Sequence, residues 1–376
     1  MKEKALDLLV CPDCHRTLTL KTFAESDGEV RDGLLECSCG LWFPIIHFVP
    51  RLLLGEYRED YGEFLKTHGL KRRNPRPQLI RRSESSRTQV QASFSEKWTS
   101  QPSWGTRGET KTFMREWMLQ KYGWGDLRGL KKSLRGRRRI LDAGTGLGRE
   151  AIEFAEVCER GEVFGVDLSE AVDAAYLNTR SYPNVHIIQA DIMRLPFRKN
   201  RFDFIFSEGV LHHTPNTKAA FEALLGHLAP KGEIALYVYV KKGPIREFCD
   251  GYLRQFTTKI SSQDCWRFSR QMTQFGKALS DLHIEFEIPE DIPALKIKAG
   301  RYNFQRFFYT HVFKCFWNDR FTFDENNLIN FDWYHPANAH RHTPEEVAGW
   351  LHKKKLKLIH LDVSESGITA RGIKGS

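Results

Sequence analysis

No hydrophobic run in the 376-residue sequence is long enough to cross a membrane, because a spanning helix needs about 18 to 20 apolar residues. The longest candidate, residues 41–54, is interrupted by two prolines, a histidine and an arginine. The opening MKEKALDLLVCPDC also lacks the apolar core and the cleavage site of a secretory signal. These absences argue against a membrane-spanning or exported chain and predict a soluble, cytoplasmic protein.

Two segments have almost no acidic residues. Residues 66–90 carry eight Lys or Arg and one acid, Glu84, while residues 128–139 carry seven Lys or Arg and no acid. The formal net charge of the chain is +10, so the basic character is local. Such segments attract phosphates, nucleic acid or anionic lipid headgroups. They are equally typical of a solvated linker and a solvated helix end.

The length predicts two or three domains, and the 41% hydrophobic content excludes disorder throughout the chain. There is no internal repeat of fixed period. From Arg138 onward apolar strands alternate with helical segments, which predicts an α/β fold with a parallel sheet. The expected strands are 138–144, 161–168, 184–191, 201–207 and 232–240, and the expected helices are 149–160, 169–181 and 217–228.

The last part of the chain has a clear helix start. Thr343–Glu346 has the N-cap, the Pro at N1 and the Glu at N3 of a capping box, which predicts a helix to about Lys354. Two strands joined by a turn at 365–367 should follow. We therefore divide the chain into a β-rich, cysteine-containing segment (1–54), a basic linker and helical lead-in (55–137), a Rossmann-like core (138–240), an insertion or cap (241–335), and a helix with a β-hairpin that completes the core (336–376).

The insertion is expected to be mainly helical and is rich in aromatic residues. Residues 301–335 hold thirteen of the 46 aromatic residues of the chain. This density predicts a cap with its own small core. The functional alternative is that some of the rings line a pocket for an acceptor molecule.

A glycine loop, Asp142–Gly148, follows the first expected strand and opens a helix. Glycines allow a ligand to approach the backbone closely, and the helix N-terminus offers unpaired N–H groups to an anion. The spacing is G-x-G-x-G, and Arg149 stands where a dinucleotide-binding loop needs its last glycine. The Gly-Lys-Ser/Thr ending of a nucleoside triphosphate loop is also missing. Asp167 ends the second strand, where it can hold a ribose diol, and Asp191 ends the third, where it can accept from an adenine amino group.

Five motifs in order, ILDAGTGLGREA, VFGVDLS, QADIMRLPF, FDFIFSEGVLHHTPN and LAPKGEIALYVY, resemble those of the class I S-adenosylmethionine-dependent methyltransferases, most closely the ubiquinone/menaquinone-biosynthesis type. The resemblance covers residues 138–240 and implies a Rossmann-like sheet, S-adenosyl-L-methionine as methyl donor and S-adenosyl-L-homocysteine as product. The implied donor-binding residues are Asp142, Gly144, Thr145, Gly146, Gly148, Asp167, Leu168, Asp191, Ile192, Ser207 and Glu208.

Methyl transfer from a sulfonium is an in-line displacement, so the protein mainly positions the acceptor and removes its proton. We expect Glu208, His212 or His213 to be the base, because they follow the fourth strand and histidine titrates near neutral pH. Alternatively, one of the two histidines caps the next helix or packs in the core.

A second polar cluster precedes the last helix and is expected to bind the acceptor. Its spacing is not a standard one for metal ligands, and a satisfied surface loop is the alternative. The cluster consists of Tyr334, His335, His340, Arg341 and His342.

Four cysteines, Cys11, Cys14, Cys37 and Cys39, fall in two close pairs in the first 39 residues. In a chain without an export signal this pattern favours a metal over disulfides. The stretch LLVCPDC…LLECSCGLWFPIIHFVPRLL resembles the small zinc-ribbon family that activates transfer-RNA and protein methyltransferases, which implies a structural Zn²⁺. The second pair is C-x-C where the family has C-x-x-C, so His15 or His47 is an alternative ligand.

The sequence thus predicts an enzyme that methylates a small-molecule or glycan-like acceptor enclosed by the insertion. The alternative is an RNA methyltransferase that uses the zinc ribbon and the basic segments for phosphate contacts. A third class is a donor-binding scaffold without activity. Neither the acceptor atom nor the oligomeric state follows from the sequence.

Overall fold

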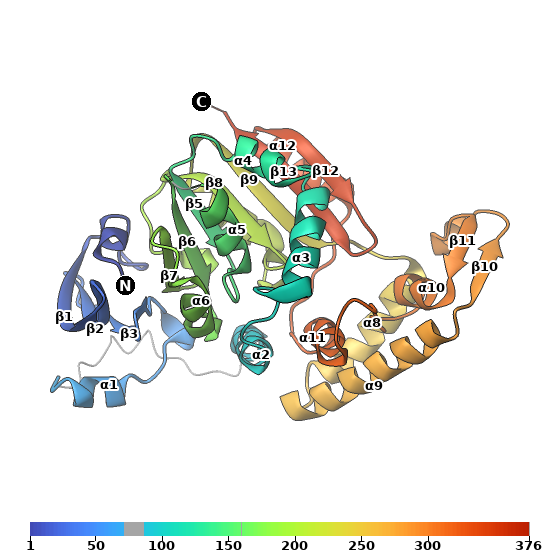
Figure 1. The fold of residues 1–376 in the computed structure, drawn as a ribbon, viewed down its shortest axis with the longest axis horizontal. Helices are drawn as coiled ribbons and strands as arrows, with labels where there is room; N and C mark the ends of the chain where they lie inside the picture. The colour runs from blue at the N-terminus through green and yellow to red at the C-terminus, as the bar shows by residue number, and fades with distance from the viewer. Residues whose placement is uncertain (71–85, 159, 376) are drawn as a thin grey trace.

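The computed structural model describes residues 1–70, 86–158 and 160–375, so most of the basic segment at 66–90 lies outside the described residues. A seven-stranded sheet with the order β12-β13-β9-β8-β5-β6-β7 forms its centre (Figure 1). Strands β5 to β9 run parallel to one another, and β13 lies antiparallel between β12 and β9. The strands are β5 Arg139–Ala143, β6 Glu162–Asp167, β7 Val185–Gln189, β8 Phe202–Glu208, β9 Leu228–Tyr239, β12 Leu356–Val363 and β13 Gly367–Lys374.

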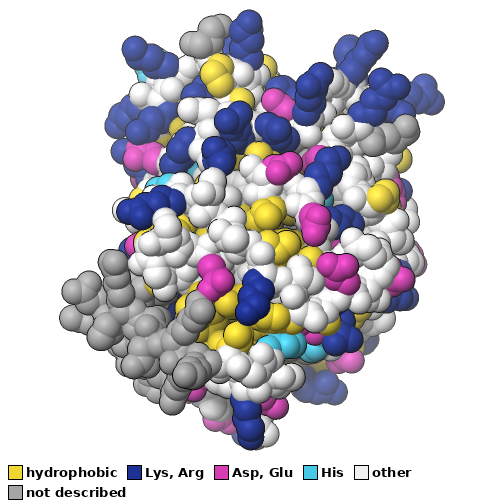
Figure 2. All heavy atoms as spheres, turned by 90° about the vertical axis from the view of Figure 1, so that its left-hand side faces the viewer, with side chains coloured by type: hydrophobic (Ala, Val, Ile, Leu, Met, Phe, Trp, Pro, Cys, Tyr) yellow, Lys and Arg dark blue, Asp and Glu magenta, His cyan; other side chains and the backbone are white. Residues whose placement is uncertain are grey.

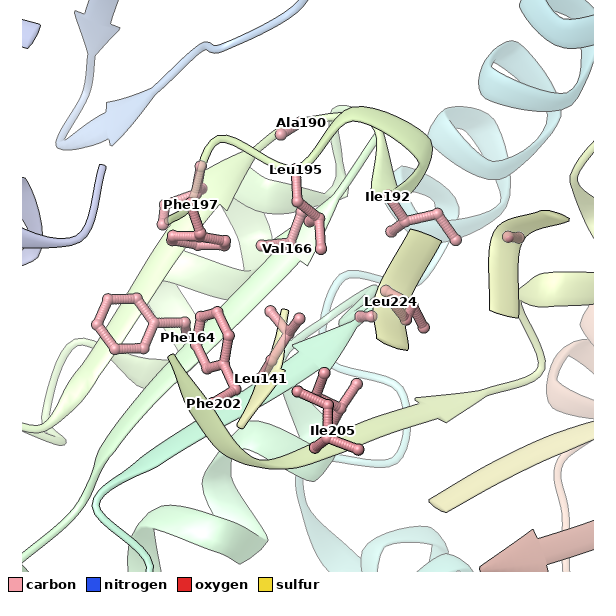
Figure 3. Close-up of a cluster of buried hydrophobic side chains, with 14 of the residues drawn as sticks. Leu141, Phe164, Val166, Ala190, Ile192, Leu195, Phe197, Phe202, Ile205 and Leu224 are labelled. Carbon is pink, nitrogen blue, oxygen red and sulfur yellow. The ribbon is translucent and has the colours of Figure 1, made fainter. Parts of the chain in front are cut away.

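Helices cover both faces of this sheet, and the alternation along each strand explains why. In β8, Phe204 and Phe206 belong to one buried cluster and Ile205 to the other, since successive side chains of a strand point to opposite faces. Figure 3 shows the second cluster, in which Leu141 and Ile205 lie near Leu224 of the helix α7. The α/β fold is thereby confirmed. The covering helices are α3 Gly108–Lys121, α4 Leu127–Ser133, α5 Arg149–Val157, α6 Ala171–Thr179, α7 Thr217–Leu225 and α12 Pro344–Lys353.

The boundaries of β9 and α7 differ from the expected ones. The sequence predicts a helix to Leu228 and a strand from Gly232, but α7 ends at Leu225 and β9 already begins at Leu228. Leu228 pairs with Phe202, and a bulge follows in which Lys231 has a φ of 61°. The turn signal Pro-Lys-Gly therefore marks an irregularity within the strand and not its start. The capping box at Thr343 and the C-terminal hairpin are confirmed.

The N-terminal segment forms an antiparallel sheet that extends the core at its β7 edge. The backbone N–H of Leu52 donates to Gln189 O at 2.8 Å, and that of Val10 donates to Pro196 O at 2.9 Å. Phe43 from this sheet shares one buried cluster with Phe197. The two parts therefore stabilise each other. The N-terminal elements are η1 Glu3–Asp7, β1 Leu18–Ser26, β2 Glu29–Cys37, β3 Trp42–Ile46, β4 Val49–Pro50, η2 Gly55–Tyr57 and α1 Gly62–Thr67.

The insertion is mainly helical, as predicted. Helix α11 packs against α9, and helix α2 (Ser86–Ser100) packs against both α6 and α11, which links the insertion to the core (Figure 1). None of the helices in the described part of the chain is long and apolar enough to cross a membrane. The division of the chain at residues 54, 137, 240 and 335 stays a prediction. The insertion consists of α8 Pro244–Thr257, α9 Ser262–Asp281, β10 Glu285–Ile288, η6 Pro293–Leu295, β11 Gly300–Asn303, α10 Phe304–His311 and α11 Phe323–Tyr334.

Candidate functional site

A cavity of about 1140 Å³ lies at the carboxyl ends of the parallel strands. Residues that follow β5, β6, β7 and β8 form one wall, and α2, α3 and the insertion form the others. The cavity is next to the point where the strand order reverses, since β6 and β8 lie on opposite sides of β5. Ligands of open α/β sheets bind at this position. Five rings of the insertion line the cavity, while other rings there pack in its core; the lining rings are Tyr309, Phe316, Trp317, Phe321 and Trp333.

The glycine loop is held in a single conformation by contacts that exclude larger side chains. Gly144 has a φ of 88°, and a Cβ there would lie 2.1 Å from Cγ2 of Val210. The backbone N–H groups of Gly144 and Thr145 both donate to Val166 O, at 2.7 and 2.9 Å. The hydroxyl of Thr145 donates to Asp142 at 2.6 Å. Gly144, Thr145 and Gly146 therefore line the cavity, whereas Asp142 shapes the loop from behind.

The two carboxylates at the ends of β6 and β7 also reach the cavity, beside Leu168 and Ile192. Asp167 accepts from the N–H of Gly146 at 2.8 Å with one oxygen and from the N–H of Ser169 at 2.9 Å with the other. Asp191 accepts from the N–H of Met193 at 2.8 Å. Burial raises the pKa of both carboxyls, and these hydrogen bonds oppose the rise. The fold thus brings the predicted donor-binding carboxylates into one cavity.

Several buried polar atoms that line the cavity have no hydrogen-bond partner among the described residues. Nη1 of Arg149 and Oε2 of Glu208 are two of them. Arg149 forms an ion pair with Glu150 through its other nitrogens, and Glu208 forms one with Lys121. Burial lowers the pKa of Lys121 to about 8, although Glu208 opposes this shift. Because unpaired buried polar atoms cost free energy, their collection in a cavity indicates a polar ligand.

His213 has one ring nitrogen bound and the other free. Its Nδ1 lies 2.7 Å from Asn338 O, so we assign the proton to Nδ1 and the lone pair to Nε2. Nε2 has no partner within the described structure and lies 3.9 Å from Oδ1 of Asp332, which is also unpartnered. The other oxygen of Asp332 lies 3.0 Å from Nζ of the buried Lys97. Burial lowers the pKa of His213 to about 4, and Asp332 opposes this shift.

Some of the predicted site residues lie away from the cavity. The hydroxyl of Ser207 donates to Ala143 O at 2.9 Å within the core. The ring of His212 stacks on Tyr239 at 3.7 Å between centroids, and neither of its nitrogens has a partner in the described chain. Gly148 packs on Thr179, where a Cβ would lie 2.7 Å from Cγ2. The assignment of these three residues to donor binding or catalysis stays a prediction that the geometry does not favour.

The polar cluster before α12 also faces away from the cavity. The hydroxyl of Tyr334 donates to Lys314 O at 2.5 Å, and Nδ1 of His335 lies 2.7 Å from Oγ of Ser93. Arg341 pairs with Glu247 at 3.0 Å. His342 lies 3.5 Å from Glu346, and His340 is exposed. The cavity is lined by the neighbouring residues Asp332, Trp333 and Asn338 and not by the five residues of this cluster. Acceptor binding by the cluster therefore stays a prediction.

Lys97 and Arg149 line the cavity but are not among the site residues expected from the sequence. Helix α2 has little apolar periodicity, so nothing in its pattern indicates that Lys97 is buried on the cavity side. A usable signal exists for Arg149, because it directly follows a loop that binds anionic groups in related folds.

The four cysteine sulfurs of the N-terminal segment lie within 4.8 Å of one another. Sγ of Cys11 is 3.8 Å from that of Cys39, and Sγ of Cys14 is 3.4 Å from that of Cys37. Zn–S bonds of about 2.3 Å in a tetrahedron require sulfurs roughly 3.8 Å apart, so the four thiols fit Zn²⁺. An ion held by all four thiols would have no open position for a substrate, so its role would be structural. His15 and His47 are not part of the group.

Metal analysis of the purified chain should find about one zinc per molecule. Replacing Cys14 with Ser should remove the metal and lower the Tm by about 5–10 °C, because a few kcal/mol of binding energy are lost and each shifts Tm by roughly 2–4 °C. Cys249→Ser, at a half-buried thiol outside the group, is the control and should keep the metal. A folded chain with far less than one zinc would contradict the assignment.

The glycine loop, the two strand-end carboxylates and the cavity at the topological switch are features of a Rossmann-like domain. Residues 140–232 match the family model described as a methyltransferase domain. The match covers part of the α/β core, and the α/β class expected from the sequence agrees with it.

Curated relatives match part of the chain. Over 106 residues the chain is 31% identical to phosphoethanolamine N-methyltransferase 2 of Caenorhabditis elegans, covering 27% of this chain and 24% of that protein. Over 144 residues it is 28% identical to the ubiquinone/menaquinone biosynthesis C-methyltransferase UbiE of Coxiella burnetii, covering 36% and 58%. The chain thus spans less than two thirds of these relatives. The solved magnesium protoporphyrin IX methyltransferase of Synechocystis aligns at 12% identity over 77% of this chain and 100% of that one, with a TM-score of 0.39.

Proposed function

We propose that this chain is an S-adenosyl-L-methionine-dependent methyltransferase whose acceptor is a small molecule enclosed by α2 and the insertion. The observation that carries the proposal is the set of unpartnered buried polar atoms around the cavity, next to the glycine loop. When bound, the donor supplies a methyl group on a sulfonium. The side chains of the cavity would bind the donor, orient the acceptor and accept its proton.

The polar atoms match the parts of the proposed donor. Asp167 would hold the ribose and Asp191 the adenine amino group, beside Ile192. The free Nη1 of Arg149 fits the carboxylate of the methionine part, and the free Oε2 of Glu208 fits its ammonium group. In this arrangement Glu208 is a donor-binding residue, because one of its oxygens pairs with Lys121 and the other is left for the ammonium group of the donor.

His213 is the proposed base. Its free Nε2 and the free Oδ1 of Asp332 face each other across 3.9 Å, which leaves an acceptor heteroatom two groups to contact. An attacking amine or hydroxyl becomes positively charged and acidic as it gains the methyl group, so a weak base is sufficient. The imidazolium that forms would be stabilised by the carboxylate of Asp332, which Lys97 keeps ionised.

The surroundings of His213 in the cavity favour a small acceptor over RNA. Trp333, Asp332 and Tyr239 line the cavity beside His213, where a nucleotide within an RNA strand would have to enter. The exposed Lys and Arg of residues 128–139 support the RNA alternative, and basic side chains gather on the upper part of the face seen in Figure 2. These side chains lie on the surface, whereas the polar atoms without partners line the cavity.

Incubation with donor carrying a labelled methyl group tests this proposal. Separate RNA, protein and metabolite pools are offered to the purified chain, and the metabolite pool should gain label. The labelled product should be absent when Gly144→Val is used, because a larger side chain collides with Val210 at this position. Label in RNA alone would favour the alternative, and label in no pool despite donor binding would favour a scaffold without activity.

A further inference from the structure

The inner part of the cavity contains a group of cations that nothing in the proposed donor chemistry uses. Lys242, Arg246 and Lys314 line it, and their exposed fractions are 8%, 1% and 7%. Lys242 lies between β9 and α8, Arg246 lies in α8, and Lys314 follows α10. Two chain segments that are distant in sequence thus bring positive charge to one buried place.

Their charges are only partly balanced. Arg246 pairs with Asp250, but its Nη1 has no partner among the described residues. Nζ of Lys242 and Nζ of Lys314 form no ion pair or hydrogen bond within the described part of the chain. Nζ of Lys314 instead lies over aromatic rings, 5.2 Å from the centroid of Tyr309 and 5.3 Å from that of Trp333. Burying unpaired cations is costly, so the group indicates an anionic ligand.

The pKa of the Tyr309 phenol is lowered by the same group of cations. Burial alone would raise the pKa of Tyr309, but Lys314, Lys242 and Arg306 lie around it and bring its pKa down to about 8. Burial lowers the pKa of Lys242 to about 8 as well. Figure 1 shows α8 and α10 together in the insertion, and their contact holds Arg246 near Tyr309, 5.3 Å from guanidinium carbon to ring centroid.

The cationic group lies next to the proposed reaction centre. The guanidinium of Arg246 and Nζ of Lys314 both lie 5.3 Å from the ring centroid of Trp333. Trp333 follows Asp332 in the chain, and its ring lies 4.9 Å from that of Tyr239, which is 5.5 Å from the ring of His213. One small molecule can therefore contact the cations with one end and His213 with the other.

We propose that the acceptor carries an anionic group, a phosphate, sulfate or carboxylate, which Lys242, Arg246 and Lys314 bind while its nucleophile faces His213. This inference rests on the proposed function, since it names the acceptor class of the same cavity. The group fixes the orientation of the acceptor, and each cation contacts the acceptor's charge and not the reacting atoms.

Calorimetry with inorganic phosphate, sulfate and acetate tests the proposal on the full chain saturated with S-adenosyl-L-homocysteine. At least one of the three anions should bind at one site, and the preferred one identifies the acid group. The double variant Lys242→Met/Lys314→Met should weaken that binding at least about tenfold, and Lys241→Met, at the exposed neighbouring lysine, should leave it unchanged. The proposal would be overturned if no anion bound, or if the wild type, the double variant and Lys241→Met bound the anion equally well.

Two further measurements distinguish a failure of the anionic-acceptor proposal from a failure of the methyltransferase proposal. The double variant should have a higher Tm than the wild type, because Met replaces unpaired buried charge with apolar packing of similar length. An unchanged or lower Tm, together with unchanged anion binding, would show that the two lysines stabilise the fold and do not bind the acceptor. In the labelling experiment the methylated product should bind to an anion-exchange resin. A labelled neutral or cationic product would overturn the proposal of an anionic acceptor and leave the methyltransferase proposal intact. If the wild-type chain did not bind S-adenosyl-L-homocysteine, the methyltransferase proposal itself would be overturned.

Discussion

Asp167→Asn is expected to weaken the binding of S-adenosyl-L-homocysteine about 100-fold. The carboxylate accepts from two backbone N–H groups, those of Gly146 and Ser169, on separate oxygens, and in our proposal it also holds the ribose. An amide keeps only one oxygen, and its NH₂ group would face an N–H donor. Losing two charge-assisted contacts of roughly 1.5 kcal/mol each corresponds to about this factor.

Asp27→Asn is the matched control for this substitution. Asp27 is exposed in the turn between β1 and β2, where its φ of 54° suits Asn equally well. Titration calorimetry should give this variant the affinity of the wild type, and circular dichroism should show that both variants remain folded. Wild-type affinity in a folded Asp167→Asn variant would contradict the role of Asp167 in donor binding.

His213→Gln is expected to reduce kcat by about 10²- to 10⁴-fold while donor affinity is unchanged, since general base catalysis contributes this much. The glutamine amide retains polarity near Asp332 and cannot take up the proton. The rate is measured with the metabolite fraction that gains label. His340→Gln, at the exposed histidine of the polar cluster before α12, should change kcat less than about twofold.

The pH profile gives this variant a second readout. Because burial disfavours the imidazolium and the pKa of His213 is about 4, the free protein holds a neutral imidazole throughout the range above about pH 5. The wild-type kcat/KM should therefore fall with decreasing pH only near pH 4, and this limb should vanish in His213→Gln. A limb near pH 6.5, or an unchanged kcat in the variant, would exclude His213 as the base.

The glycine loop and the strand-end carboxylates of the site could be predicted from the sequence, because each of them depends on a short stretch of neighbouring residues. A glycine loop after a strand, or a carboxylate at the end of the next strand, depends on a few neighbouring residues and on the parallel order of the sheet. Asp167 and Asp191 reach the cavity for this reason. The four cysteines could be assigned to one metal site in the same way, because the two members of each pair are close in sequence.

The acceptor side could not be predicted, because its residues converge from distant segments. Lys97 and Asp332 meet across more than 200 residues of sequence. Neighbours in sequence also separate: successive residues of α11 are rotated by about 100°, so Asp332 and Trp333 line the cavity while Tyr334 and His335 pack elsewhere. His212 and His213 follow each other in a 3-10 turn with their ring centroids 4.3 Å apart, but His213 lines the cavity whereas His212 packs on Tyr239. Polar residues that are close in sequence, as in the cluster before α12, therefore do not predict which side chains line the same cavity.

We propose above that the cavity at the carboxyl edge of the sheet binds the methyl donor. The most direct test is calorimetric titration of the folded chain with S-adenosyl-L-homocysteine, with Gly144→Val titrated alongside. One binding site per chain is expected in the wild type, and no measurable binding is expected in the variant. A folded wild-type chain that gives no binding heat and no rise in Tm with the compound would contradict it.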